Sequence, residues 1–182
     1  KEPIPVDSFS ARLDWWRETQ GWVIYGQDIA LDNPDLTLAS RFRLDLFDHP
    51  FLALTGRIDV KNAGHAYRYF PLQVMDKELV DYLSGAIKGG KAKGADLLWY
   101  GEFRDFPYEK GEGIFQVAVP LEQATYEFFP GWQPLTDLQI DLLFQNASLD
   151  MRSRSTKLGK ASSDSVHAWI PDLAPGGHLY VD

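Results

Sequence analysis

The stretch from Asp76 to Gly90, which reads DKELVDYLSGAIKGG, is the segment around which we expect the fold to be organised. Its apolar residues recur at three- and four-residue spacing, which places them on one side of a helix. Asp76 is a suitable N-cap, and Gly89-Gly90 suits the stop just past a helix C-terminus. The pattern predicts one principal α-helix at about residues 76–88, whose covering face consists of Leu79, Val80, Leu83, Ala86 and Ile87.

Most of the remaining chain alternates between apolar and polar residues, which is typical of antiparallel strands with one wet face. The alternation is cleanest over residues 36–46, 52–61 and 138–144. A helix of about thirteen residues is roughly 20 Å long, so it cannot cover roughly eight to ten strands of about 30 Å. We therefore expect a mainly β protein, in which a long-stranded antiparallel sheet is curved or folded over into a taco-like groove.

The length of 182 residues suits a single domain with a real core. Within it we expect a loose lead-in over residues 1–8, N-terminal strands over 9–62, a helical insert over 64–90 and C-terminal strands over 91–182. The chain begins without Met and stops at Asp182 in an expected strand. We therefore interpret it as a fragment of a longer protein.

The net charge and the missing cysteines narrow the classes of function. A formal charge of −8 argues against nucleic acid and against docking on an anionic membrane surface. The lack of cysteine excludes disulfides and thiol chemistry within these residues. No run of about 18 apolar residues is present, so we expect no membrane-spanning helix in this sequence.

The polar residues do not form a recognisable catalytic or metal-binding motif. Asp137 and Asp141 share one face of an expected strand but lie about 13 Å apart, beyond the usual separation of a glycosidase acid–base pair. A zinc site needs ligands that converge, and the histidines fall in separate elements without metal-ligand spacing. These histidines are His49, His65, His167 and His178. We predict no catalytic residue, no metal and no cofactor.

The tryptophans leave one alternative open, a carbohydrate-binding β-sandwich in which exposed rings stack on sugars. They are Trp15, Trp16, Trp22, Trp99, Trp132 and Trp169. Core packing is the commoner role of a strand Trp, and we expect Trp132, in a Pro-Gly turn, to be the most exposed. The apolar rows consist of Leu, Ile, Val and Phe, which favour acyl chains, because a sugar site needs planar polar groups beside the ring.

The stretch from about Tyr67 to Ile170 resembles a known family. It contains RYFPLQVMDKELVDYLSGAIKGG, then FPGWQPLTDLQIDLLFQNASLDM and STKLGKASSDSVHAWIPDL. These segments are similar to the central periplasmic region of the YhdP family, large envelope proteins of Gram-negative bacteria related to AsmA and TamB. The first 60 residues match only as alternating strands.

The resemblance implies a non-enzymatic protein of the periplasm that is anchored in the inner membrane and conducts phospholipid between the inner and outer membranes. The implied partners are phospholipid acyl chains and the remainder of the same chain, with membrane contact only through parts outside these residues. We expect the helix to act as a plug, lid or cap. We expect the groove to be lined by Leu38, Phe42, Leu54, Ile58, Val117, Val119, Tyr126, Phe128, Leu138, Ile140, Leu142 and Phe144.

Overall fold

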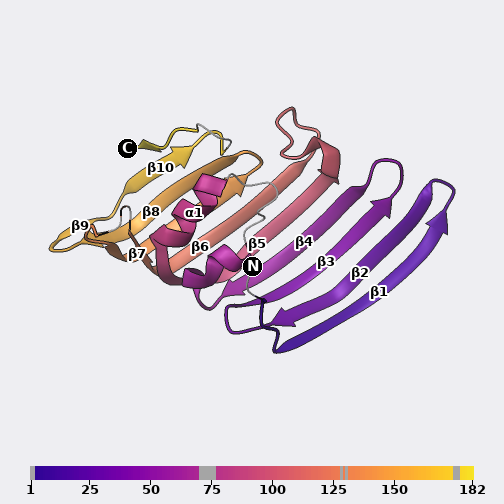
Figure 1. Ribbon diagram of the computed structural model, residues 1–182, viewed down its shortest axis with the longest axis horizontal. Coiled ribbons are helices and arrows are strands. Elements are labelled where there is room, and N and C mark those ends of the chain that lie inside the picture. Colours follow the sequence, from indigo (N-terminus) through magenta and orange to yellow (C-terminus); the bar gives the residue numbers. More distant parts are fainter. Residues whose placement is uncertain (1–2, 70–76, 128, 130, 174–176) are drawn as a thin grey trace.

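The chain forms one open antiparallel sheet, as a computed structural model describes it for residues 3–69, 77–127, 129, 131–173 and 177–182. The sheet has eleven strands in the order β1-β2-β3-β4-β5-β6-β7-β8-β10-β11, with β9 paired to β8. The prediction of a mainly β, long-stranded antiparallel fold is confirmed. Of the two expected shapes, the curved open sheet is the one observed (Figure 1).

The strands follow the alternating segments of the sequence closely, and the strand bounds are as follows. They are β1 Ser8–Glu18, β2 Gly21–Asp32, β3 Leu36–Leu46, β4 Phe51–Val60, β5 Ile87–Glu102, β6 Ile114–Tyr126, β7 Leu135–Gln145, β8 Ser148–Leu158, β9 Ala161–Ser163, β10 Val166–Ile170 and β11 Tyr180–Val181. The helical elements are the 3-10 helices η1, Ala63–Arg68, and η2, Phe103–Asp105, and the α-helix α1, Lys77–Ala86.

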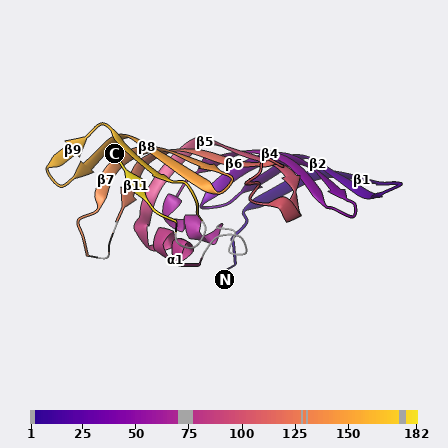
Figure 2. The ribbon, with the colours of Figure 1, turned by 90° about the horizontal axis from the view of Figure 1, so that it is seen from above.

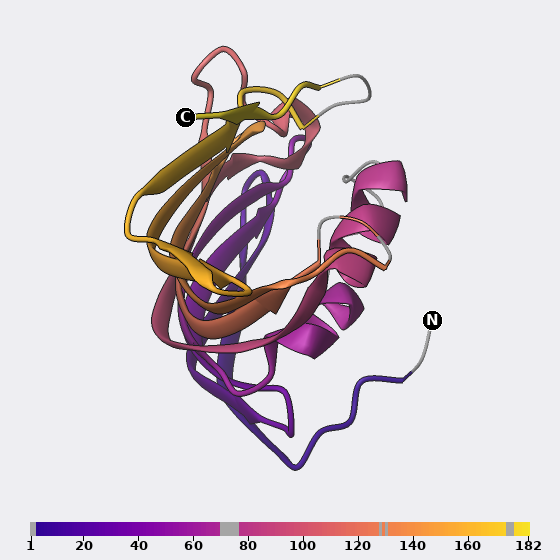
Figure 3. The ribbon, with the colours of Figure 1, turned by 90° about the vertical axis from the view of Figure 1, so that its left-hand side faces the viewer.

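The sheet is strongly curved, and its longest dimension runs across the strands from β1 to β10 (Figures 1 and 2). Seen from one end, the strands bend into a C-shaped section, with α1 on the concave side (Figure 3). The connection between β4 and β5 contains both η1 and α1, so one excursion of the chain supplies the cover of the concave side.

The strand register places the apolar rows of successive strands on one face. Phe42 lies opposite both Gly26 and Leu54, and Leu54 lies opposite Trp99. Where β6 contains a bulge, Gln123 adopts a positive φ of 53°. The extra residue at such a bulge changes the parity of the strand, so apolar positions on both sides of it can face the same way.

One cluster of buried hydrophobic side chains lies between η1 and the concave side of the sheet. It consists of Ala63 from η1 and of sheet residues Ala92, Leu121, Ala124 and Leu138. Half-buried apolar side chains surround this cluster, and they include Val60, Val119, Tyr126, Ile140 and Leu142.

The helix ends earlier than its sequence pattern predicts. It spans Lys77–Ala86, and Ile87 is the first residue of β5 and not a member of the helical face. The expected stop, Gly89-Gly90, lies inside that strand, so the helical insert is shorter than 64–90. The physical reason is pairing with β6, because Glu127 donates its N–H to the carbonyl of Ala86 and Ile87 pairs with Tyr126.

The structure tests only part of the predicted helical face and N-cap. The expected N-cap, Asp76, lies outside the described residues, and the side chain of Leu79 is not among those described. The other three members of the predicted face, Val80, Leu83 and Ala86, are buried.

Candidate functional site: an apolar concave face

The concave face of the sheet is a continuous apolar surface, which we call the trough. Cross-strand pairs extend it across the sheet, since Leu31 lies opposite Leu38, and Leu38 lies opposite Ile58. Farther along, Val117 lies opposite Phe144, and Val119 opposite Leu142. The trough therefore crosses the strands and does not follow any one of them.

The predicted groove residues lie on this face and are mostly half-buried. Those found there are Leu38, Phe42, Leu54, Ile58, Val117, Val119, Tyr126, Leu138, Ile140, Leu142 and Phe144. Only Leu138 among them is fully buried, at 5% exposed. Phe128 lies outside the described residues. Side chains of a closed core would be fully buried, and a solvent-exposed sheet face would consist mainly of polar residues. The trough is therefore an apolar surface with partial access to solvent.

The trough is covered at β5–β7 and open toward β1. Over β5–β7, η1 packs on the concave side through Ala63, and α1 lies on the same side (Figures 2 and 3). On β1, Phe9, Leu13 and Trp15 continue the trough because they pair with Leu31, Gly26 and Ile24. Trp15 is 67% exposed, and Phe9 and Leu13 are exposed as well. The apolar area available to a ligand therefore lies mainly over the N-terminal strands.

A buried polar turn, Asn33–Asp35, lies between β2 and β3 and holds η1 in place. The Asp35 carboxylate is 2% exposed and accepts hydrogen bonds from His65 Nδ1 at 2.6 Å, Arg68 at 3.1 Å and the Tyr69 hydroxyl at 3.0 Å. Asn33 Nδ2 donates to the same hydroxyl at 2.9 Å, and Asn33 Oδ1 accepts from the Asp35 N–H. We call these five residues the Asp35 cluster.

The ionisation of Asp35 reflects its partners. Burial raises the pKa of the carboxyl, but hydrogen bonds from His65, Tyr69 and Arg68 lower it by more, so that the pKa lies below its ordinary value of 3.8. Burial likewise raises the pKa of the Tyr69 hydroxyl. Asp35 is therefore an ionised carboxylate at neutral pH, and its charge is compensated inside the fold.

An aromatic cluster covers the trough at the other end of β5 and β6. The Tyr108 hydroxyl accepts from Trp99 Nε1 at 2.8 Å, and Tyr108 is 1% exposed. The Trp99 ring stacks on Phe106 with 5.2 Å between centroids and meets Phe115 edge-on at 5.1 Å. Because Trp99 and Phe115 belong to the trough row, this cluster and η1 limit the exposed width of the trough from opposite ends of the strands.

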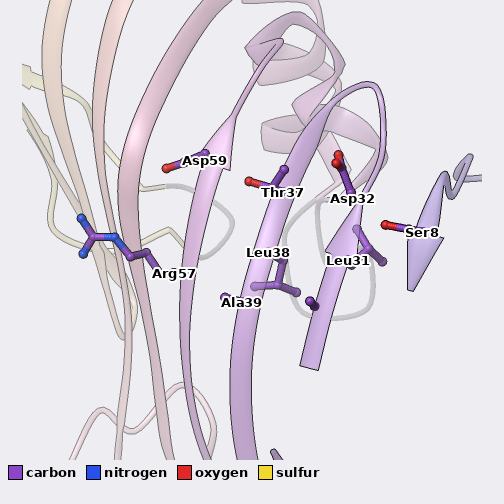
Figure 4. A pocket seen from close by; sticks show the side chains of 9 residues that line it. Ser8, Leu31, Asp32, Thr37, Leu38, Ala39, Arg57 and Asp59 are labelled. Carbon is purple, nitrogen blue, oxygen red and sulfur yellow. The ribbon is translucent and has the colours of Figure 1, made fainter. Parts of the chain in front are cut away.

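A hollow of about 360 Å³ lies at one edge of the N-terminal strands, beside the start of β1 and β3 and the end of β2 and β4 (Figure 4). It occupies only a small part of the concave side and is distinct from the trough as a whole. Its wall is mixed, because the apolar pair Leu31 and Leu38 adjoins Asp32 and Asp59. Arg57 extends away from the other labelled side chains (Figure 4). Among the described groove residues, only Leu38 lines it, so the extended trough is the better candidate site.

The described residues contain no group of His, Asp and Glu side chains that could hold a metal. Asp137 pairs with Lys157 at 2.8 Å and Asp141 with Arg154 at 3.2 Å, and both pairs are exposed. These carboxylates are solvated surface charges.

Among the described residues, no helix has both the length and the hydropathy of a membrane-spanning segment.

The tryptophans do not share one sugar-stacking platform. Trp15 and Trp22 belong to the trough rows, whereas Trp16 lies on the opposite face, with Arg43 6.0 Å from its ring centre. Trp132 is 68% exposed and is the most exposed tryptophan, as its Pro-Gly turn predicts. Trp169 stacks between His167 and Tyr180.

Sequence reasoning found the trough rows but missed the Asp35 cluster. The segment Asn33-Pro34-Asp35 has the composition of any exposed turn, and the partners of Asp35 lie about thirty positions later in the chain. No local pattern marks such a contact. Tyr108 was missed for the same reason, because its burial depends on β5 and on the turn after β7.

Comparison with known proteins identifies the family. A family model described as YhdP protein matches residues 1–182. The chain is 36% identical over 176 residues, or 96% of its length, to the intermembrane phospholipid transporter YhdP of Escherichia coli (strain K12). The match spans 14% of that transporter. No solved structure matches the chain significantly. The resemblance noted for residues 67–170 thus extends over the whole chain, which belongs to the YhdP family.

Proposed function

We propose that the chain is a non-enzymatic segment of a longer periplasmic protein that guides phospholipid between the inner and outer membranes along the trough. The protein would be anchored in the inner membrane through parts outside residues 1–182. The similarity to the Escherichia coli intermembrane phospholipid transporter supports this proposal. The observation that carries it is the apolar row that crosses β1–β7 on the concave face and is accessible to solvent over the N-terminal strands.

The physical chemistry of the trough suits an acyl chain. Removing a CH₂ group from water contributes about 0.8 kcal/mol and requires no directional contact. A row of Leu, Ile and Phe side chains such as Phe42, Leu54 and Ile58 therefore offers many similar positions to a sliding chain. Polar residues such as Arg43, Thr55 and Arg57 alternate with them on the opposite face.

Photo-crosslinking in living cells tests this proposal with neighbouring residues of one strand. A benzoylphenylalanine replaces Leu54, on the trough, or Thr55, on the convex face, in the whole protein as cells produce it. We expect phospholipid adducts, detected by mass spectrometry, at position 54 and not at position 55. Equal adducts at the two positions, or none at position 54, would contradict the proposed function.

A further inference from the structure

We propose that Asp35 is a positioning residue of the trough: it fixes η1, and with it α1, on the concave side. An acyl chain then binds over β2–β4 and is excluded from the strip of β5–β7 directly beneath the helices, which we call the covered strip. This inference rests on the proposed function and adds to it the part of the trough that is accessible. It concerns the described residues Ala63–Tyr69 and Lys77–Ala86, which we call the positioned segment.

The positioned segment is tied to the turn between β2 and β3 through both the side chain and the backbone of Asp35. The side chain accepts from His65, Arg68 and Tyr69, which lie within or next to η1. The carbonyl of Asp35 accepts the N–H groups of Lys61 at 2.8 Å and Asn62 at 3.1 Å, just before η1. The start of η1 is therefore fixed from two sides.

Small residues in the trough make room for η1. Ala92 and Ala124 are each 2% exposed and form one buried cluster with Ala63 of η1. Gly64 of η1 lies so close to β5 that an added Cβ would come within 2.9 Å of the Lys88 carbonyl oxygen. The covered strip is thus shaped to receive a backbone segment, and Ala63 completes its core.

The helix α1 extends this cover with an apolar side. Val80, Leu83 and Ala86 are buried, while Gly85 is exposed and an added Cβ there would meet nothing within 4 Å. At its C-terminal end the helix is held by the hydrogen bond from the Glu127 N–H to the Ala86 carbonyl. The positioned segment therefore buries the same kind of apolar surface that an acyl chain would bury.

Loss of the Asp35 charge should loosen the positioned segment before it loosens the sheet. A buried carboxylate is stable only when it is paired, and its partners here belong mainly to η1 and Tyr69. The strands β2–β4 keep their own ladders when that charge is removed. Access to the trough should therefore increase under the helices and not over β4.

Cysteine labelling in the 182-residue chain, which has no cysteine of its own, tests this inference. Leu142→Cys reports on the covered strip, because Leu142 packs against the buried cluster that contains Ala63. Leu54→Cys reports on the open trough and Thr55→Cys on the convex face. The probes are dodecyl and methyl methanethiosulfonate, and the measurement is the ratio of their labelling rates. Asp35→Asn is compared with Asp137→Asn, a matched control at the exposed ion pair with Lys157.

We expect Asp35→Asn to raise the dodecyl labelling ratio at the Leu142→Cys site about fivefold, the equilibrium effect of losing roughly one hydrogen bond. The ratio at the Leu54→Cys site and the Asp137→Asn control should stay unchanged. Hydrogen exchange should accelerate in residues 77–86 and not in β8. An unchanged ratio at the Leu142→Cys site would overturn the inference, whereas equal ratios at the Leu54→Cys and Thr55→Cys sites would instead overturn the proposed function.

A milder variant covers the case in which Asp35→Asn fails to fold. Tyr69→Phe removes only the hydroxyl that joins Asp35 to Asn33. We expect the same site-selective rise at the Leu142→Cys site, smaller than with Asp35→Asn. A rise that is equal at all three labelled sites would show general unfolding and would refute a positioning role.

Discussion

The indole N–H of Trp99 donates to the Tyr108 hydroxyl at 2.8 Å, and this hydrogen bond ties the loop after β5 to the trough. Tyr108 is almost wholly buried, so neither partner can readily exchange this bond for one with water. Because the two residues are nine positions apart and on different elements, the bond fixes a loop that covers one end of the trough.

Tyr108→Phe should lower the free energy of unfolding by about 1 kcal/mol, because the Trp99 N–H loses its acceptor. The measurement is urea unfolding followed by tryptophan fluorescence and by circular dichroism. Tyr100→Phe is the matched control, since Tyr100 is 55% exposed and its hydroxyl is not part of this bond. Equal losses in the two variants would show that the Trp99–Tyr108 bond contributes nothing specific.

Two glycines should respond to alanine in opposite directions. Gly101 has a φ of +155°, and an added Cβ would lie 2.6 Å from the Tyr108 ring, so Gly101→Ala should destabilise the fold. Gly85 lies in α1 with open space around it, so Gly85→Ala should stabilise by up to about 1 kcal/mol. Thermal unfolding of both variants checks this pair, and a stabilised Gly101→Ala protein would show that the loop packs differently.

Acid should weaken the fold partly through Asp35. Burial raises the pKa of this carboxyl, but its hydrogen bonds lower it by more, so the pKa in the folded chain lies below 3.8. Between the folded and unfolded pKa values the unfolded chain binds more protons, so stability rises with pH there. The contribution of Asp35 is therefore complete above about pH 4 and is lost as pH falls through the folded pKa.

Asp35→Asn should accordingly flatten the fall in melting temperature below pH 4, as measured by circular dichroism. The fall should not vanish, because a hydrogen bond from His167 also lowers the pKa of Asp150. Asp137→Asn serves as the control at an exposed ion pair. The same acid slope in the wild type and in Asp35→Asn would count against an ionised, paired Asp35.

Charge placed in the trough should impair lipid passage more than charge placed beside it. Leu54→Asp puts a carboxylate on the apolar row, where it opposes an acyl chain, whereas Thr55→Asp adds the same charge to the polar face. Transfer of labelled phospholipid, with protein level and melting temperature measured in parallel, separates the two effects. Equal transfer by the two variants at equal protein level would argue against passage over β4.

The strands and their apolar faces could be predicted because both depend on local alternation. Leu36–Leu46 and Phe51–Val60 are found almost where the pattern places them. The end of α1 was harder to predict, because two glycines mark a helix stop and a strand bulge equally well. Here Gly90 lies against Ala124 of β6, so strand pairing decides its conformation.

The covered and open parts of the trough could not be separated from the sequence, since Leu54 and Leu142 alternate identically with their polar neighbours. Only the path of η1 distinguishes them, and that path depends on Asp35, which is distant in sequence. A curved open sheet and a folded-over sheet also require the same alternation of apolar and polar residues. The shape of the sheet and the path of η1 therefore depend on contacts between residues distant in sequence, which local periodicity does not reveal.

The direction of the ladders has a mechanical consequence. Hydrogen bonds between antiparallel strands lie perpendicular to the strands, and here that is along the length of the trough. A pulling force between the two ends would load successive ladders in series. The ladder of β3 and β4 has ten residue pairs, that of β8 and β10 has five, and that of β10 and β11 has two. Under tension the C-terminal strands would detach first, while the β2–β4 region kept its shape.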